Sequence, residues 1–124
     1  MKLSATREAF LEPLQAVIGV VERRQTMPIL ANVLIIAQDD GVSVTATDLE
    51  VEMVAGADIM VGQSGEVTLP GRKLLDICRA LKDKAKVELT VSGEKATVRS
   101  GRSRFTLATL PAGEFPVIED INAQ

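Results

Sequence analysis

The sequence predicts an α+β domain in which two antiparallel sheets carry both helices on one side. Three observations predict it. The order strand, helix, strand, strand, strand occurs twice, each half contains a single amphipathic helix, and the strands after each helix are joined by tight turns. Residue identity between the halves is weak, so the repeated order of elements, rather than repeated letters, indicates the duplicated β-α-β-β-β unit.

The first half begins with a short strand over residues 2–5 and a helix after Thr6, whose hydroxyl suits a helix cap. The apolar residues at helical spacing are Phe10, Leu14, Val17, Ile18 and Val21. Pro13 conflicts with this helix, because an interior proline removes a backbone hydrogen bond and costs about 3 kcal/mol. We therefore expect a kink or a later start, and an end near residues 19–21.

Three strands complete the first half. Residues 29–38 are apolar on both faces, which is typical of a strand covered on two sides. The Asp40-Gly41 pair then predicts a tight turn. Two strands with alternating side chains follow, and their apolar positions are Val42, Val44 and Ala46, then Val51, Met53 and Ala55.

The second half repeats this order. A strand at 66–70 leads into a helix with one apolar stripe, formed by Leu74, Leu75, Ile77, Cys78 and Leu81. Alternating strands follow, with turns at Ser92-Gly93 and Gly101, and the last strand spans 102–110. Residues 111–124 fit no element. Because they carry more apolar side chains than a free terminus usually shows, we expect a loop and a linker toward a second domain.

The composition is that of one ordinary globular domain, with 124 residues, 46% hydrophobic and 25% charged. The sequence has neither a run of about 18 apolar residues nor a leader with a cleavage site. We therefore expect no membrane association and a cytoplasmic location. The single cysteine, Cys78, has no partner for an internal disulfide, which fits a reducing compartment, and its place on the apolar stripe favours a buried side chain.

The sequence predicts no catalytic residues, no metal site and no cofactor. It contains no histidine, the commonest general base and metal ligand, and no glycine-rich phosphate loop. Asp48, Glu50 and Glu52 leave a metal-dependent enzyme as the weakest alternative, although alternate acidic positions are more typical of a solvated sheet face. With three Phe and neither Trp nor Tyr, a platform for stacking single-stranded nucleic acid is also disfavoured.

The basic residues are grouped, although the net charge is −3. Arg72 and Arg79 are seven residues apart, so they project from nearly the same face of the second helix, opposite its apolar stripe. Asp76 lies between them at helical pairing distance and would neutralise part of that face. From spacing alone, a solvated surface is the simpler explanation. The other groups are Arg23 and Arg24 after the first helix, the lysines at 82, 84 and 86, and Arg99, Arg102 and Arg104 on the final hairpin.

The last strand carries two kinds of side chain on its two faces. Arg102 and Arg104 share one face, and Phe105 and Leu107 share the other. If this strand ends a sheet, its unpaired backbone groups can continue the ladder into another subunit, with the arginines reaching acidic partners. A core-facing Phe and Leu pair with exposed charges explains the pattern equally well. A scaffold module that binds a protein along this edge and binds no nucleic acid is therefore an alternative function.

Four separated segments resemble one known family. They are TMPILANVLI at 26–35, TATDLEVEM at 45–53, LPGRKLLDICRAL at 69–81 and VRSGRSRFTLATLPAGEFP at 98–116. In these segments the chain resembles the amino-terminal domain of the bacterial DNA polymerase III beta subunit, the sliding clamp. The resemblance covers essentially the whole chain, and it implies a single clamp domain over 1–124, the first of three domains in a subunit.

The resemblance implies a function without catalysis. Two subunits of that family join head to tail into a ring around duplex DNA, which confers processivity on the replicative polymerase. The helices would line the central hole, so that Arg24, Arg72 and Arg79 approach the phosphate backbone without reading bases. Polymerase and clamp loader would bind through domains absent from this chain.

The same resemblance implies a subunit interface. It would be formed by the second helix and the 102–110 strand, facing the third domain of the other subunit of a homodimeric ring. The residues carried over to this interface are Lys73, Ile77, Leu81, Arg102, Arg104, Phe105 and Leu107.

Overall fold

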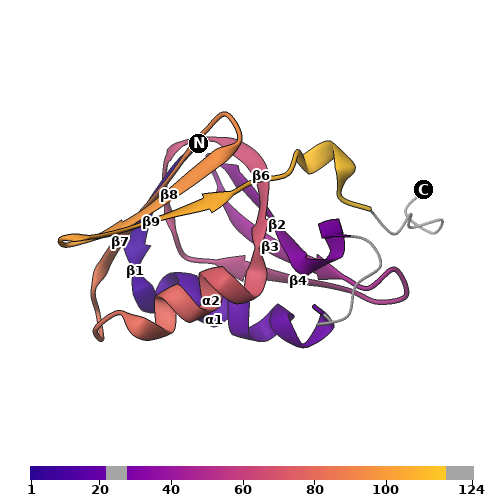
Figure 1. Cartoon of the computed structure of the whole chain (residues 1–124), viewed down its shortest axis with the longest axis horizontal. Helices are drawn as coiled ribbons and strands as arrows, with labels where there is room; N and C mark the ends of the chain where they lie inside the picture. Colours follow the sequence, from indigo (N-terminus) through magenta and orange to yellow (C-terminus); the bar gives the residue numbers. More distant parts are fainter. Residues whose placement is uncertain (22–27, 117–124) are drawn as a thin grey trace.

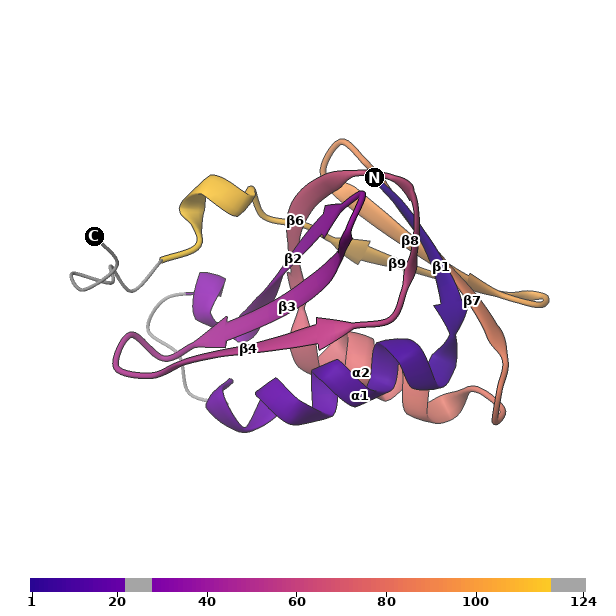
Figure 2. The ribbon, with the colours of Figure 1, turned by 180° about the vertical axis from the view of Figure 1, so that it is seen from behind.

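The computed structural model describes residues 1–21 and 28–116 (Figure 1). It contains a five-stranded and a four-stranded antiparallel sheet. Helices α1 (Arg7–Val17) and α2 (Gly71–Ala80) lie side by side on one side of these sheets, as Figures 1 and 2 both show. The predicted architecture is confirmed.

The remaining elements follow the predicted order, with one addition. In the first half they are β1 (Lys2–Thr6), β2 (Asn32–Gln38), β3 (Gly41–Thr47) and β4 (Glu52–Ala57). In the second half they are β6 (Gly65–Pro70), β7 (Lys86–Ser92), β8 (Lys95–Ser100) and β9 (Ser103–Ala108). Strand β5 (Met60–Gln63) lies between the halves and was not predicted. Short 3-10 helices span Ile18–Val20, Pro28–Ala31 and Ala112–Glu114.

Each half contributes its first strand to the sheet of the other half. The five-stranded sheet has the order β5-β1-β7-β8-β9, and the four-stranded sheet has the order β4-β3-β2-β6. In the first sheet Leu3 lies opposite Leu89, and in the second Val33 lies opposite Leu69. All four side chains are buried. The two halves are therefore interlocked, and neither completes its sheet without the other.

Helix α1 differs from the expectation at Pro13. The helix begins at Arg7 and passes through Pro13, which is buried, so the later start is wrong. The backbone N–H of Arg7 donates to the carbonyl of Ala85 at 2.8 Å, which satisfies one of the unpaired donors at the start of the helix. Phe10 and Leu14 are also buried, and each such burial is worth about 1.5–3 kcal/mol, enough to offset the missing bond. Thr6 occupies the cap position, but its side chain makes no capping hydrogen bond.

Several boundaries also differ. The segment expected as one strand over 29–38 starts in a 3-10 helix, and its strand begins at Asn32, whose side-chain Nδ2 donates to Thr68 Oγ1 at 3.0 Å. The pairing of Gln38 with Gly41 leaves Asp39 and Asp40 as the two-residue turn, one position earlier than expected. The last strand is shorter than 102–110 and ends at Ala108.

The two later hairpin turns require glycine. Ser92 pairs with Lys95, so Gly93 and Glu94 form the first turn, one residue later than predicted. Gly93 has φ of +61° and Gly101 has φ of +58°, which is the left-handed region favoured by glycine at the start of a tight hairpin turn. The short turns hold β7, β8 and β9 in one continuous meander.

The main core lies between the helices and the sheets. Helix α2 buries Leu74, Leu75 and Cys78 there. Its first residue, Gly71, approaches β2 so closely that a Cβ atom would lie 2.9 Å from Val33 Cγ1, so only glycine fits without a shift. Across the described part of the chain, no helix has both the length and the apolar content that crossing a membrane requires.

A second, smaller core forms around Phe115, near the end of the described part of the chain. Phe115 is buried together with Ile29, Leu30 and Leu34. This burial accounts for part of the apolar content of the segment expected as a loop and linker, of which residues 117–124 lie outside the described part of the chain.

Candidate functional site

The outer face of α2 carries most of the positive charge of the helical layer. Lys73 and Arg79 are exposed, Arg72 is half-buried, and the exposed Asp76 lies between them. Both ion pairs of the described residues are formed by Arg7, so Asp76 is not paired with Arg72 or Arg79. The predicted separation of the basic face from the apolar stripe of this helix is therefore present.

Helix α1 does not contribute a comparable basic face. Arg7 is its single Lys or Arg residue, and this side chain is paired with Glu8 and Asp83. The exposed positions of the helix include Glu12, Gln15 and Ala16. Helix α1 itself therefore adds no unpaired Lys or Arg to the basic face of α2. Arg24, which follows this helix in the sequence, lies outside the described residues.

Arg72 makes a structural contact at the start of α2. Its Nη2 donates to the backbone carbonyl of Val21 at 2.9 Å, and its Nε is buried without a hydrogen-bond partner. The guanidinium thus joins the amino end of α2 to the chain just after α1. Arg72 is thus half-buried and already hydrogen-bonded within the domain, which distinguishes it from the exposed Arg79.

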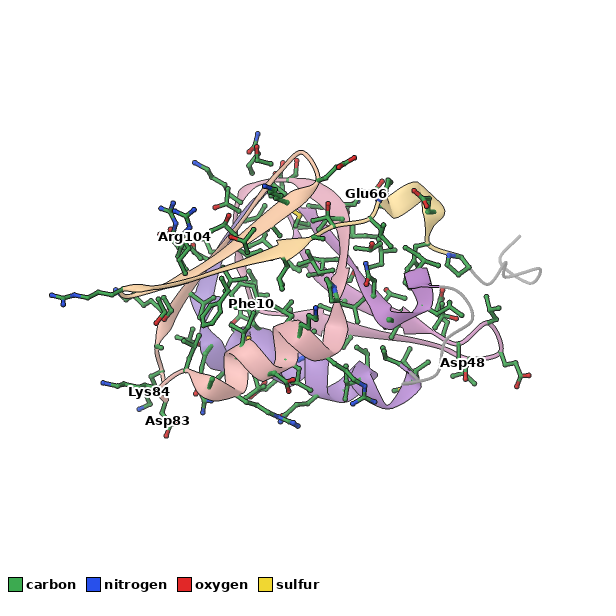
Figure 3. The ribbon with its side chains drawn as sticks, in the orientation of Figure 1. Phe10, Asp48, Glu66, Asp83, Lys84 and Arg104 are labelled. Carbon is green, nitrogen blue, oxygen red and sulfur yellow. The ribbon has the colours of Figure 1, made fainter. Side chains whose placement is uncertain are left out.

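Strand β9 lies at the edge of the five-stranded sheet, as required for pairing with another chain. It pairs with β8 over Ser103–Ala108, and the backbone groups on its other side are unpaired apart from the bridge of Leu110 to Thr68 beyond the strand's end. Arg104 is exposed and lies opposite Arg99. In Figure 3 the Arg104 side chain points away from the sheet, at the end of the molecule that also holds the β8–β9 turn.

The apolar face of β9 points into the domain. Leu107 lies opposite Ala96, is 7% exposed and belongs to the main core. Phe105 lies opposite Val98 and is half-buried against the same core. Of the two, only Phe105 has surface left for another chain. The placement of Leu107 at a subunit interface conflicts with its burial in this domain.

A hollow separates the end of α2 from the β8–β9 turn. It has a volume of about 650 Å³ and we name it the α2–β9 hollow. Leu81 and Arg102, two residues predicted for the interface, both line it. Its lining contains three basic side chains and no carboxylate; the full set is Ala80, Leu81, Lys82, Ala85, Lys86, Ser100, Gly101, Arg102 and Ser103. The hollow is therefore suited to an acidic group.

Helix α2 and strand β9 share one face of the molecule. Both lie on the near side in Figure 1 and on the far side in Figure 2. On α2, Lys73 is exposed and Ile77 is half-buried, so both retain surface that another chain could contact. The structure thus places the two elements named for the interface, α2 and β9, on the same side of the molecule.

A cluster of hydrogen bonds around Arg7 was not predicted from the sequence. The Arg7 guanidinium donates to Glu8, to Asp83 and to the carbonyl of Cys78, and the Glu8 carboxylate accepts the backbone N–H of Lys84. Two of these contacts join residues that are far apart in the sequence: Arg7 and Cys78 are separated by 71 positions, and Arg7 and Asp83 by 76. No local spacing signals such a link, because it depends on the packing of α1 beside α2.

Asp48, one of the three acidic residues considered as metal ligands, has a structural role. Its Oδ1 accepts the backbone N–H groups of Glu50 at 2.9 Å and Val51 at 2.7 Å. These bonds hold the pKa of Asp48 below its ordinary value, since they favour the charged form, with Val51 the larger cause. Residues 1–21 and 28–116 contain no group of three or more acidic, Cys or His side chains placed to hold a metal ion.

Comparison with known proteins agrees with this geometry. The family model of the DNA polymerase III beta subunit, N-terminal domain, matches residues 1–119. The chain is 50% identical over 121 residues to the beta sliding clamp of Pseudomonas putida and 48% identical to that of Escherichia coli K12. Each alignment covers 97% of this chain and 33% of the relative, so the chain spans about a third of the length of these relatives.

Solved structures give the same result. The fold matches a sliding clamp of Pseudomonas aeruginosa, solved with griselimycin, with a TM-score of 0.92 and 49% identity over 97% of this chain and 33% of that one. It matches the DNA polymerase sliding clamp of Caulobacter crescentus with a TM-score of 0.94 and 43% identity over 98% of this chain and 34% of that one. The chain therefore belongs to the family of the DNA polymerase III beta subunit, N-terminal domain.

Proposed function

We propose that this chain forms the first of three domains of a sliding-clamp subunit, and that two such subunits close into a ring around duplex DNA. The ring confers processivity on the replicative polymerase in the cytoplasm and catalyses no reaction. The observation that carries this proposal is the pairing of α1 and α2 on one side of the sheets, with the basic outer face of α2 next to a free sheet edge. The family relationship supports the same function.

In this function the helices face the DNA, and each contact between a basic side chain and a phosphate is weak enough for the ring to slide. Arg79, Arg72 and Arg24 approach the phosphates, and the closed ring, rather than the affinity of any contact, retains the DNA. Such contacts act mainly by releasing counterions and carry no sequence information. Because the outer face of α1 lacks unpaired cations, we expect this domain to contribute only a few phosphate contacts.

The subunit interface in this proposal is formed by α2, β9 and the α2–β9 hollow. Arg102 and Arg104 reach acidic groups of the other subunit, and the basic lining of the hollow favours the same charge. Lys73, Ile77, Leu81 and Phe105 supply the surrounding contact. Polymerase and clamp loader bind through the other two-thirds of the subunit.

Retention on circular DNA tests this function directly. The full-length protein should remain on nicked circular duplex DNA through gel filtration and should slide off after the same DNA is cut once. The isolated domain should bind duplex DNA weakly and lose that binding steeply with salt. Equal retention on circular and linear DNA, or binding that does not change with salt, would contradict the proposal.

A further inference from the structure

The chain that follows α2 forms one wall of the α2–β9 hollow. This segment is neither helix nor strand. Helix α2 ends at Ala80 and β7 begins at Lys86, so residues 81–85 form a loop between them. Within this loop Lys84 has φ of +62°, a left-handed conformation that side chains other than glycine adopt only when their surroundings impose it. One backbone bond inside the loop, from the N–H of Ala85 to the Lys82 carbonyl at 3.1 Å, closes a turn around this residue, and further contacts from outside the loop hold it in place.

Those contacts come from the first two residues of α1. The backbone N–H of Arg7 donates to the Ala85 carbonyl at 2.8 Å, and its Nη1 donates to the Cys78 carbonyl, at the end of α2, at 3.1 Å. The Glu8 carboxylate accepts the N–H of the left-handed Lys84 with both oxygens, at 3.0 and 3.2 Å. Arg7 and Glu8 thus contact the end of α2, the left-handed Lys84 and the last residue of the loop, Ala85.

The charges in this cluster serve geometry more than stability. Asp83, which pairs with Arg7, is 86% exposed, and Glu8 is 37% exposed, so solvent screens both ion pairs. Arg7 itself is 15% exposed, and its Nε–Glu8 bond of 2.9 Å orients the carboxylate toward the loop backbone. Three of the bonds to the loop and the end of α2 involve main-chain atoms, which set backbone conformation directly.

We propose that Arg7 and Glu8 are positioning residues for the subunit interface, holding the loop at 81–85 and with it one wall of the α2–β9 hollow. This inference rests on the proposed function, which places that hollow at the interface. Leu81, Lys82 and Ala85 line the hollow and belong to the held loop. Figure 3 shows Asp83 and Lys84 at the same end of the molecule as Arg104. The two residues act through the loop without touching the other subunit.

The test compares subunit association with domain stability in the full-length protein. The variants are Glu8→Gln, which loses the charge and one of the two acceptor oxygens, and Arg7→Ala, with Arg7→Lys in reserve if Arg7→Ala does not fold. The control is Ile35→Val, a mild core change in β2, which the structure places in the other sheet from the loop. Sedimentation measures the dimer dissociation constant, and thermal melting measures stability.

We expect Glu8→Gln and Arg7→Ala to raise the dimer dissociation constant at least fivefold. Ile35→Val should lower the melting temperature by a similar amount to these variants but leave the dimer dissociation constant unchanged. Amide exchange should also become faster at Lys84 and Ala85. A wild-type protein that forms rings, with variants whose dissociation constant stays within twofold of it, would overturn the inference. A wild-type protein that forms no ring would instead count against the proposed function, so the two failures are distinct.

Discussion

The Arg72 guanidinium is hydrogen-bonded to the Val21 carbonyl at 2.9 Å, so the start of α2 holds the chain just beyond α1. We expect Arg72→Gln to lower the free energy of unfolding by about 1–2 kcal/mol, because a bond from a charged donor is lost. Urea denaturation of the domain measures this loss. An unchanged midpoint would show that the bond does not contribute to stability.

Arg72→Lys separates this structural role from a role in DNA binding. Lysine keeps the positive charge but lacks the planar group that reaches Val21. If Arg72 also contacts a phosphate, Arg72→Gln should reduce the slope of log K against log salt by about one, whereas Arg72→Lys should retain most of it. Filter binding of duplex DNA at several salt concentrations measures both slopes, and Arg79→Gln provides the comparison with an exposed arginine.

Cys78 should make stability fall at high pH. Burial raises the pKa of its thiol to about 11, from 9.0, with the nearby Arg7 charge opposing the shift. The folded state thus keeps its proton where the unfolded state has lost it, so this contribution is complete below pH 9 and declines as the pH rises from 9 toward 11. Two pKa units correspond to roughly 2–3 kcal/mol.

The control for this prediction is Cys78→Ala, in which the same titration is absent. Urea denaturation of both proteins at pH 8 and pH 10.5 gives the difference, and the wild type should lose more stability than the variant. Every other side chain is the same in the two proteins, so the comparison isolates the contribution of Cys78. Equal losses in the two proteins would refute the assignment.

Phe105 and Leu107 should respond differently, although they share one face of β9. Leu107 is buried in this domain, so Leu107→Ala should cost about 2–4 kcal/mol of domain stability. Phe105 is half-buried, so Phe105→Ala should weaken dimerisation of the full-length protein more than it weakens the domain. Dimer dissociation constants and denaturation midpoints of the single variants separate the two effects, which a double variant would merge. A larger effect of Leu107→Ala than of Phe105→Ala on dimerisation at equal stability would reverse this assignment.

Patterns of apolar residues were sufficient to predict the order of the main elements. Alternation identified β3 and β7, and the helical stripe of α2 is buried at Leu74, Leu75 and Cys78 as expected. Strand β5 was missed because Met60, Val61, Gly62 and Gln63 are mostly exposed, without the alternation of a half-buried strand. Pro13 misled the prediction of α1, since intrinsic propensity is outweighed when a helix buries a whole face.

The candidate site was predicted less completely than the fold. The exposure of Arg79 and Arg104 agrees with their spacing in the sequence, whereas the edge position of β9, which the sequence left open, is given by the order of the strands in the sheet. The contact of Arg72 with Val21 and the cluster around Arg7 could not be predicted, because each joins residues more than 50 positions apart through the packing of the helices. Sequence periodicity identifies the face of an element but not its neighbour.

The turn between β3 and β4 should lose stability in acid through Asp48. Its pKa is lowered by the N–H groups of Val51 and Glu50, so the carboxylate stabilises the folded state at neutral pH. As the pH falls, the unfolded state takes up this proton first, and the contribution is lost as the pH passes from the ordinary value down through the lowered one. The same turn holds Leu49 at φ of +81°, with its N–H bonded to Thr47 Oγ1 at 3.1 Å.

Asp48→Asn is the matched variant. The asparagine side chain keeps an oxygen that can accept the same backbone N–H groups, but it does not titrate. Between pH 5 and pH 2, the wild type should lose more stability than Asp48→Asn, whereas Asp48→Ala should be less stable than both at pH 7. Thermal melting across this range gives the three curves. Parallel curves for wild type and Asp48→Asn would mean that the two backbone bonds do not depend on the charge of residue 48, and would contradict this prediction.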